Sequence, residues 1–242
     1  MTDRQMPVIS MRRIGRTYGK GAQRVDALVD FDLDVAPGEW VAITGRSGSG
    51  KTTALNIAGG LDEPTTGTVL VEGAHLGDLS PNELARLRRQ SIGYVFQDFN
   101  LLPTLTAAEN VALPLELDGL SLAEARRHAA DSLEQVGLAA MLDRYPDQMS
   151  GGEQQRVAIA RGLVGPRRLL LADEPTGALD DITSEAILSM LRARCDAGAA
   201  TIMVTHEPSF AAWADRVVRL RDGHIESITE ASAVPPSLAE IR

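Results

Sequence analysis

The chain lacks several features that would direct it to particular classes of protein. It has a single cysteine, Cys195, so no disulfide can form within the chain, which fits a reducing compartment. No apolar run approaches the roughly 20 residues that a helix needs to cross a bilayer, and residues 1–13 lack the apolar segment of a secretion signal. We therefore expect a cytoplasmic protein in which Cys195 is a packed helix residue.

Positive charge is also in short supply. Lysine and arginine number 24 against 33 aspartates and glutamates, which gives a net charge of −9 and a pI near 5.0. No global basic field draws such a chain to nucleic acid or anionic lipid, so nucleic acid is disfavoured as the main partner. The remaining composition, 44% hydrophobic and 24% charged, is that of an ordinary globular domain.

Short apolar runs give the main signal for the fold. They cover residues 40–44, 92–96, 169–172 and 200–205. These runs do not alternate polar with apolar residues, as expected of strands covered by helices on both faces of a parallel sheet. A glycine or a polar residue ends or follows each run: Gly45, Gln97, Asp173 and His206. Ligands of open α/β sheets bind at the carboxyl ends of the strands, so the sequence predicts an α/β fold with a mostly parallel sheet and one shared site.

The flanks of this sheet have other patterns. Residues 7–14 and 26–35 are typical of half-exposed strands and predict an antiparallel flank at the N-terminal side. Arg221-Asp222-Gly223 predicts a hairpin turn near the other end. We expect a single domain over residues 1–230 and a loosely ordered tail over 231–242.

Helical patterns dominate the middle of the chain. A subdomain over about residues 100–160 is predicted to be helical, and Ser121 and Glu124 form a capping box that opens a helix reaching about Val136. A further helix is expected over residues 181–194, before the last apolar run.

A phosphate-binding loop lies between a predicted strand and a predicted helix. It consists of Gly45, Arg46, Ser47, Gly48, Ser49, Gly50, Lys51, Thr52 and Thr53. Glycines let backbone N–H groups close around phosphate oxygens, Lys51 reaches the β- and γ-phosphates, and the Thr52 hydroxyl is a ligand for Mg²⁺. The alternative, a flexible glycine turn, does not account for Lys-Thr at this offset.

Two carboxylates, Asp173 and Glu174, end the third apolar run. Uncompensated buried charge is costly, so the pair suggests a bound metal and a reacting water. Asp173 is placed to hold Mg²⁺, and Glu174 is the natural general base for a water that attacks the γ-phosphate. Gln97 could contact both the metal and the water, and His206 could orient the water. Taken singly, each is equally compatible with a structural or surface role.

Residues 149–164, MSGGEQQRVAIARGLV, predict a helix with an unusual start. A capping box of Ser150 and Glu153, with Val157, Ala160 and Val164 facing the core, is sufficient for a helix. The capping box and the apolar positions do not explain Gly151 and Gly152. In a helix, each glycine lowers stability by up to about 1 kcal/mol relative to alanine. Bare backbone at a helix N-terminus allows a phosphate to approach closely.

Together these segments resemble the nucleotide-binding subunits of ABC transporters. Residues 45–52 resemble the Walker A loop, Gln97 the Q-loop, residues 150–154 the signature motif, residues 169–174 Walker B, residues 178–180 with Asp180 the D-loop, and His206 the H-loop. Tyr18 stands where the family places the aromatic residue that stacks on adenine. Met149 differs from the family's usual leucine, a mild apolar exchange.

The resemblance implies ATP and Mg²⁺ as ligands and a head-to-tail dimer in which each ATP lies between the Walker A loop of one chain and the signature helix of the other. One copy of each motif predicts a homodimer, or a heterodimer with a similar chain. It also implies an integral membrane permease as partner, which would hold this subunit on the inner face of the membrane. Residues 98–106, with Phe99, Leu101 and Leu102 expected to be exposed, are the predicted contact.

Three functional readings follow from the resemblance. Residues 96–115 and 173–180 resemble the group that includes lipoprotein-releasing, macrolide-exporting, peptide-antibiotic-resistance and cell-division ATPases, which indicates an exporter or extractor of hydrophobic, peptide or lipid-linked substrates. A signalling switch acting on a membrane partner is an alternative. A remodelling ATPase is disfavoured, because the chain has no long coiled-coil insertion and no second ATPase unit.

Overall fold

The computed structural model describes residues 6–230, and the predicted tail over 231–242 lies outside the described residues. The strands are β1 Ile9–Tyr18, β2 Val25–Val35, β3 Trp40–Gly45, β4 Thr66–Val71, β5 Ala74–His75, β6 Ile92–Val95, β7 Leu169–Asp173, β8 Ala200–Val204, β9 Arg216–Arg221 and β10 His224–Glu230. The α-helices are α1 Lys51–Ala58, α2 Pro81–Ser91, α3 Ala107–Leu117, α4 Leu122–Gln135, α5 Gly151–Leu163, α6 Asp181–Asp196 and α7 Pro208–Ala211. Short 3-10 turns cover Gly21–Gln23, Leu76–Asp78, Ala139–Met141 and Pro146–Gln148.

The predicted parallel sheet is confirmed. Its strand order is β10-β9-β3-β8-β7-β6, and all neighbours except β10 and β9 run parallel. Alternate residues of β7 belong to opposite cores: Leu169 and Leu171 pack on one face, whereas Leu170 and Ala172 pack on the other. Two apolar faces explain why the run at 169–172 has no polar alternation.

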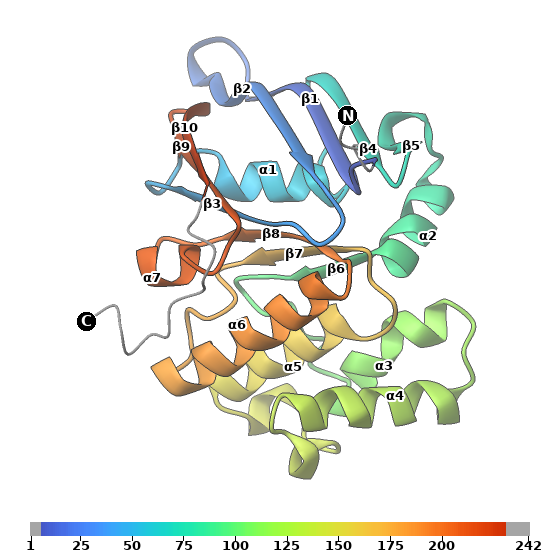
Figure 1. The fold of residues 1–242 in the computed structure, drawn as a ribbon. Helices are drawn as coiled ribbons and strands as arrows, with labels where there is room; N and C mark the ends of the chain where they lie inside the picture. The colour runs from blue at the N-terminus through green and yellow to red at the C-terminus, as the bar shows by residue number, and fades with distance from the viewer. Residues whose placement is uncertain (1–5, 231–242) are drawn as a thin grey trace.

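The antiparallel flank at the N-terminal side is also confirmed, with longer strands than expected. β1 pairs with β2 antiparallel, and β4 and β5 complete a second sheet of order β2-β1-β4-β5. Sequence analysis identified neither β4, β5 nor α2. Figure 1 shows α1 between this second sheet and the parallel sheet. The amino end of α1 is therefore held from two sides.

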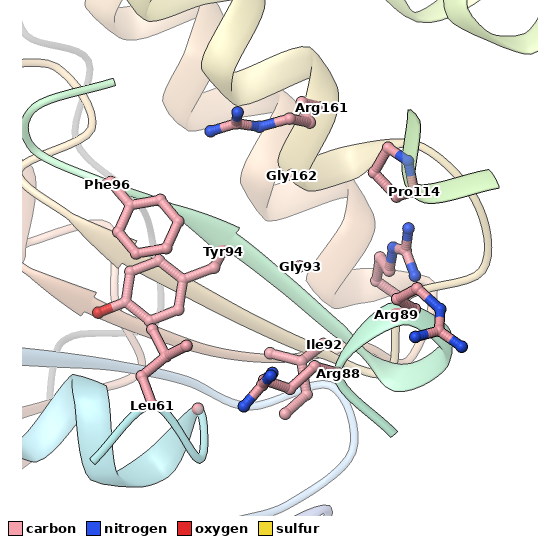
Figure 2. Close-up of a pocket in the computed structure, with 12 residues that line it drawn as sticks. Leu61, Arg88, Arg89, Ile92, Gly93, Tyr94, Phe96, Pro114, Arg161 and Gly162 are labelled. Carbon is pink, nitrogen blue, oxygen red and sulfur yellow. The ribbon is translucent and has the colours of Figure 1, made fainter. Parts of the chain in front are cut away.

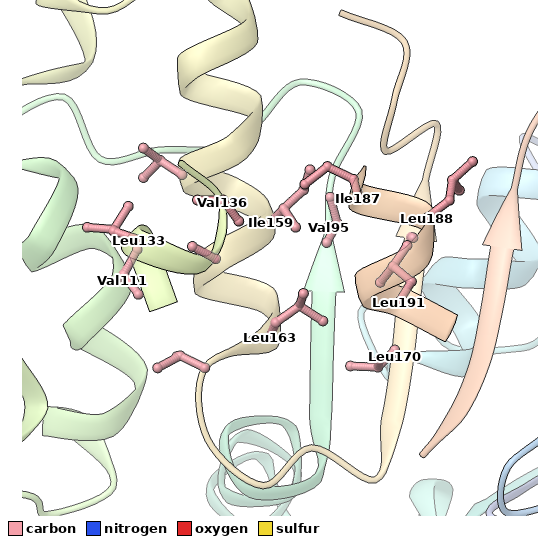
Figure 3. Packing of buried hydrophobic residues seen from close by; sticks show 14 of the residues in the cluster. Val95, Val111, Leu133, Val136, Ile159, Leu163, Leu170, Ile187, Leu188 and Leu191 are labelled. Atoms are coloured by element: carbon pink, nitrogen blue, oxygen red, sulfur yellow. The ribbon is translucent and has the colours of Figure 1, made fainter. Parts of the chain in front are cut away.

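Helices α3, α4, α5 and α6 cover the other face of the parallel sheet (Figure 1). Figure 3 shows Ile159 and Leu163 of α5 and Leu188 and Leu191 of α6 in this core, around strands β6 and β7. The predicted capping box at Ser121 opens α4, and Cys195 is buried in α6 as expected. The elements agree with a helical region over about 100–160, whose bounds as a subdomain stay a prediction.

A close backbone approach sets the position of α5 against β6. A Cβ atom at Gly93 in β6 would lie 2.0 Å from the carbonyl oxygen of Gly162 in α5, so only glycine allows this contact. At the far edge of the same sheet, Asp222 and Gly223 have φ values of 49° and 80°, as a type I′ hairpin turn requires. The predicted hairpin between β9 and β10 is therefore confirmed.

Candidate active site

The phosphate loop joins β3 to α1 and is held in place by contacts of its own backbone. Gly45 has φ 149°, and a Cβ atom there would lie 2.3 Å from the carbonyl oxygen of Leu220 in β9. Gly50 has φ 101°, and its Cβ would lie 2.2 Å from the carbonyl oxygen of Ala27 in β2. Both ends of the loop are therefore wedged against the two sheets, and neither glycine can be replaced without moving backbone.

The inside of the loop is open. Gly48 has φ 77°, but a Cβ atom at that position would meet no heavy atom within 4 Å. No side chain caps α1, and its first turn carries no acidic residue, so the first N–H groups of the helix are available to an anion. The Lys51 ammonium donates to the carbonyl oxygens of Gly45 and Arg46, each at 2.9 Å. The loop thus combines free backbone N–H donors with the long cationic side chain of Lys51. Together these groups can bind a polyphosphate.

Asp173 ends β7 beside this loop and is 4% exposed. Burial raises the pKa of its carboxyl group, and a hydrogen bond with the Thr52 side chain acts in the opposite direction. Thr52 is the second residue of α1, so this hydrogen bond joins the phosphate loop to the buried carboxylate.

Glu174 and His206 lie side by side at the ends of neighbouring strands. The Glu174 backbone has φ 48° and its N–H donates to the carbonyl oxygen of Val204 at 3.0 Å. His206 Nδ1 is 2.9 Å from Glu174 Oε1. This hydrogen bond and the negative charge of Glu174 raise the pKa of His206.

One cavity of about 390 Å³ collects most of the predicted site residues. It is lined by Ala27, Gly45, Ser47, Gly48, Gly50, Lys51, Thr52, Thr53, Gln97, Asp173, Glu174, Val204 and His206. Arg46 and Ser49 belong to the loop but not to this lining; the Ser49 side chain is buried and its hydroxyl has no hydrogen-bond partner. Tyr18, at the end of β1, is 40% exposed and lies outside the cavity. Ala27 and Val204 were not identified from the sequence, because apolar side chains carry no chemical signature.

The signature residues lie apart from this cavity, at the start of α5. Ser150 caps the helix: its side chain accepts from the N–H of Glu153 and donates to the Glu153 carboxylate at 2.8 Å. A Cβ atom at Gly152 would lie 3.2 Å from the carbonyl oxygen of Ala178, whereas one at Gly151 would meet nothing within 4 Å. Asp180 caps α6 by accepting from the N–H of Thr183. None of these residues lines the phosphate-loop cavity of its own chain.

A second concave surface lies between α2, β6 and α5, with a volume of about 220 Å³. Figure 2 shows arginines from α2 and from α5 around it, beside the stacked rings of Tyr94 and Phe96. We call this surface the arginine groove; its arginines are Arg88, Arg89, Arg161 and Arg167. Sequence analysis missed it, although the segment RLRRQ in α2 is a local basic cluster in an acidic chain.

The donor set at the end of β7 fits Mg²⁺. Thr52, Asp173 and Gln97 offer hydroxyl, carboxylate and amide oxygens, and Mg²⁺ prefers oxygen ligands. Within residues 6–230, no three His, Cys, Asp or Glu side chains are grouped to enclose a metal. Beside nucleotides, Mg²⁺ is usually held through one or two side chains together with water and phosphate oxygens.

A phosphate loop, a buried carboxylate and a second carboxylate at the end of the same strand define a P-loop nucleotide hydrolase. The family model described as "ABC transporter" matches residues 28–177, and the chain belongs to this family. It is an ABC ATPase. In the part of the chain that the structure describes, no helix has the length and apolarity to cross a membrane.

This chain covers different shares of the length of two of its relatives. The chain is 46% identical over 218 residues to the uncharacterized ABC transporter ATP-binding protein YknY of Bacillus subtilis (strain 168), covering 90% of this chain and 95% of YknY. It is 45% identical over 221 residues to the macrolide export ATP-binding/permease protein MacB of Hyphomonas neptunium, covering 91% of this chain but 34% of MacB. The chain thus spans about a third of that relative and nearly all of YknY.

A solved structure agrees with the fold. The dimeric structure of a post-hydrolysis state of the ATP-binding cassette MJ0796 bound to ADP and Pi superimposes with a TM-score of 0.89 at 40% identity. The match covers 93% of this chain and 100% of that chain. The α/β cassette fold is therefore shown, with its antiparallel N-terminal sheet and mostly parallel main sheet.

The contact between Glu174 and His206 predicts a measurable pKa change. Glu174→Gln removes the negative charge that raises the pKa of His206, so this pKa should fall toward its ordinary value of 6.5. In the wild type, the stabilisation from this pair is present below the unfolded histidine pKa and is lost as the pH rises through the raised pKa. An NMR titration of the four histidines measures the shift. An unchanged His206 titration would show that the two side chains do not interact in solution.

Proposed function

We propose that two copies of this chain bind two ATP molecules head to tail and drive a separately encoded membrane permease. Each ATP would lie between the phosphate loop of one copy and the start of α5 of the other. Closure on ATP and opening after hydrolysis would move the permease between its states. Three features of the described residues support this: an unexplained glycine at the start of α5, the residues around Glu174 and the arginine groove.

Gly151 carries the proposal. It begins α5, is exposed and has no positive φ, and a Cβ atom there would meet no atom within 4 Å. Nothing among the described residues therefore requires glycine, although alanine would favour the helix by up to about 1 kcal/mol. Gly152 is different, because its Cβ would press on the carbonyl oxygen of Ala178. A phosphate from another chain, approaching the bare N–H groups of α5, explains Gly151.

The residues at the cavity divide the chemistry of hydrolysis among them. Lys51 would turn from its loop carbonyls to the β- and γ-phosphates, and Glu174 would accept a proton from the water that attacks the γ-phosphorus. His206, held by Glu174, would donate a hydrogen bond to the γ-phosphate. Thr52, Asp173 and Gln97 would hold Mg²⁺, which when bound neutralises charge on the phosphate oxygens. The adenine would stack on Tyr18.

The arginine groove is the surface we assign to the permease. None of its arginines has a carboxylate of the described chain within ion-pair distance, and the Nε atoms of Arg89 and Arg167 are buried without a hydrogen-bond partner. Arg161 donates to the carbonyl oxygens of Asn100 and Phe99 at 2.6 and 2.7 Å, and burial lowers its pKa to about 10. A partner helix with carboxylates would satisfy these cations.

The exposure predicted for the apolar side chains of residues 98–106 needs correction. Of the three apolar side chains expected to be exposed, only Leu102 is, at 44%. Phe99 and Leu101 are half-buried, and Leu101 packs against the core of the helical region. The segment instead contacts the arginine groove from one side. The carbonyl oxygens of Phe99 and Asn100 accept hydrogen bonds from Arg161, which lines the groove. The docking surface that we propose is therefore more cationic and less apolar than the one predicted from the sequence.

The relatives support a transport role of a particular kind. MacB is named for macrolide export, and a relative 44% identical to this chain, PvdT of Pseudomonas fluorescens, for pyoverdine export. We propose that the permease served by this chain exports or extracts hydrophobic, peptide or lipid-linked substrates. YknY, which this chain matches over 95% of its length, supports a permease encoded as another chain.

Glu174→Gln tests the assignment of the base. The amide cannot take the proton from water, so ATP should still bind while turnover falls by at least about 100-fold. The unhydrolysed nucleotide should hold the closed dimer, which sedimentation in ATP would detect. Turnover at the wild-type rate would remove Glu174 from the role of base.

Ser150→Asp tests the shared site. Aspartate is as good a helix cap as serine, so α5 should remain, but its charge should repel the partner's γ-phosphate. ATP should bind to the monomer with unchanged affinity and no longer drive dimerisation. Ser121→Asp is the matched control, because Ser121 forms the same capping box with Glu124 on α4. A Ser150→Asp chain that dimerises normally in ATP would exclude the signature helix from the site.

Arg89→Glu tests the arginine groove. Reversing this charge should reduce co-purification of the membrane partner by at least about tenfold, since it places like charges together at a contact. ATP binding should stay at the wild-type level. Arg86→Glu on the same helix is the control, because Arg86 is exposed and lies outside the groove lining. Equal loss of the partner with both variants, or with neither, would contradict docking in the groove.

A further inference from the structure

Arg16, Tyr18 and Asp62 form a three-residue contact at the end of β1. The Arg16 guanidinium donates to both carboxylate oxygens of Asp62, at 2.9 and 2.6 Å. The Tyr18 hydroxyl donates to the same carboxylate at 2.6 Å. The Arg16 guanidinium carbon also lies over the Tyr18 ring, 4.5 Å from its centroid. Asp62 therefore accepts hydrogen bonds from both side chains, and Arg16 covers one face of the ring.

The segment that carries Asp62 is itself fixed. Its N–H donates to the carbonyl oxygen of Asn56 in α1 at 3.2 Å, so the segment is tied to the helix that begins at the phosphate loop. Three residues on, the N–H of Thr65 donates to the carbonyl oxygen of Gly15, and its hydroxyl accepts from the N–H of Thr17. The segment around Asp62 therefore links the end of β1, which carries Tyr18, to helix α1.

These contacts are stronger than an ordinary surface ion pair. The Arg16 and Asp62 side chains are only 23% and 22% exposed, and their pairing is bidentate, which adds geometric definition to charge. Tyr18 by contrast is 40% exposed. An exposed tyrosine side chain without such contacts exchanges among its rotamers, and a ligand that stacks on the ring must select one of them.

We propose that Arg16 and Asp62 are positioning residues that hold the Tyr18 ring as a preformed platform for the purine base of the nucleotide. Arg16 occupies one face of the ring and leaves the other to the base. The inference rests on the proposed nucleotide site, since it assumes that the base stacks on Tyr18. On this proposal, the affinity of the chain for the purine base depends on Arg16 and Asp62, two charged residues that contact neither the base nor the phosphates.

The test separates the base end of the nucleotide from the phosphate end. Asp62→Ala should weaken ATP binding by roughly fivefold to tenfold, a part of the effect expected for a full base stack. Binding of inorganic tripolyphosphate, which has no base, should be unchanged. Tyr18→Phe keeps the ring but removes its hydroxyl, so it should weaken ATP by about twofold to fivefold with the same selectivity. Isothermal titration calorimetry gives all of these constants.

Matched variants complete the test. Arg12→Ala breaks another ion pair of β1, with Asp34, and should leave ATP binding unchanged. In a Tyr18→Ala background, Asp62→Ala should have no additional effect, because the two act through one ring. Tyr18→Phe also keeps the test valid if Asp62→Ala does not fold.

The outcomes distinguish the proposed nucleotide site from the positioning role of Arg16 and Asp62. If Tyr18→Ala itself leaves ATP affinity unchanged, the base does not stack there and the proposed nucleotide site is wrong at its base end. If Tyr18→Ala weakens ATP but Asp62→Ala and Tyr18→Phe do not, the positioning role is overturned while the nucleotide site stands. Equal weakening of ATP and tripolyphosphate by Asp62→Ala would also overturn it, because the contact would then support the phosphate loop.

Discussion

Backbone pairing of four parallel strands, β3, β8, β7 and β6, is the constraint on which the rest of the structure depends. Parallel pairing places the carboxyl ends of all four strands along one edge, so the phosphate loop, Gln97, Asp173 and His206 are brought together from distant parts of the chain. Both faces of the sheet are buried, and each strand is locked by side chains that point into two cores. The positions of the candidate site residues are therefore set by the pairing and packing of these strands.

The two glycine-bearing helix starts have different physical explanations. At α1, Gly45 and Gly50 are required by contacts inside the chain, because any side chain there would strike the carbonyl oxygens of Leu220 and Ala27. At α5, Gly151 has no such contact. A residue that weakens its own helix without a reason inside the chain indicates a requirement outside it. This difference between the two helix starts supports the proposal that the start of α5 is one half of a site shared between chains.

Much of this could be predicted from the sequence, because the relevant signals are local. Apolar runs without alternation identify buried parallel strands, Ser121 and Ser150 with their glutamates identify helix starts, and glycines at fixed offsets identify the phosphate loop. β4 and β5 have no local signal and were missed, because they depend on pairing with distant segments. α2 was also missed, although Ser80 and Glu83 form a capping box at its start and Pro81 is its first residue. The roles of the site residues stay predictions, since geometry brings the groups together without showing the reaction.

The same limit applies to surfaces. From the sequence, Phe99 and Leu101 were expected to be exposed in a loop, but both are half-buried, and Leu101 packs against the core of the helical region. The arginine groove joins α2 to α5, which are 60 residues or more apart, so only the fold brings its cations together. The contact of Arg16 and Tyr18 with Asp62 is hidden in the sequence for the same reason.

A mixing experiment tests the central claim, the shared site, most directly. A Lys51→Ala chain has a disabled phosphate loop and an intact signature helix, and a Ser150→Asp chain has the reverse. Each alone should be inactive. Mixed, they can form a head-to-tail dimer in which the phosphate loop of the Ser150→Asp chain meets the signature helix of the Lys51→Ala chain, so one intact site and ATP turnover should return. A mixture as inactive as either variant alone would contradict the shared site.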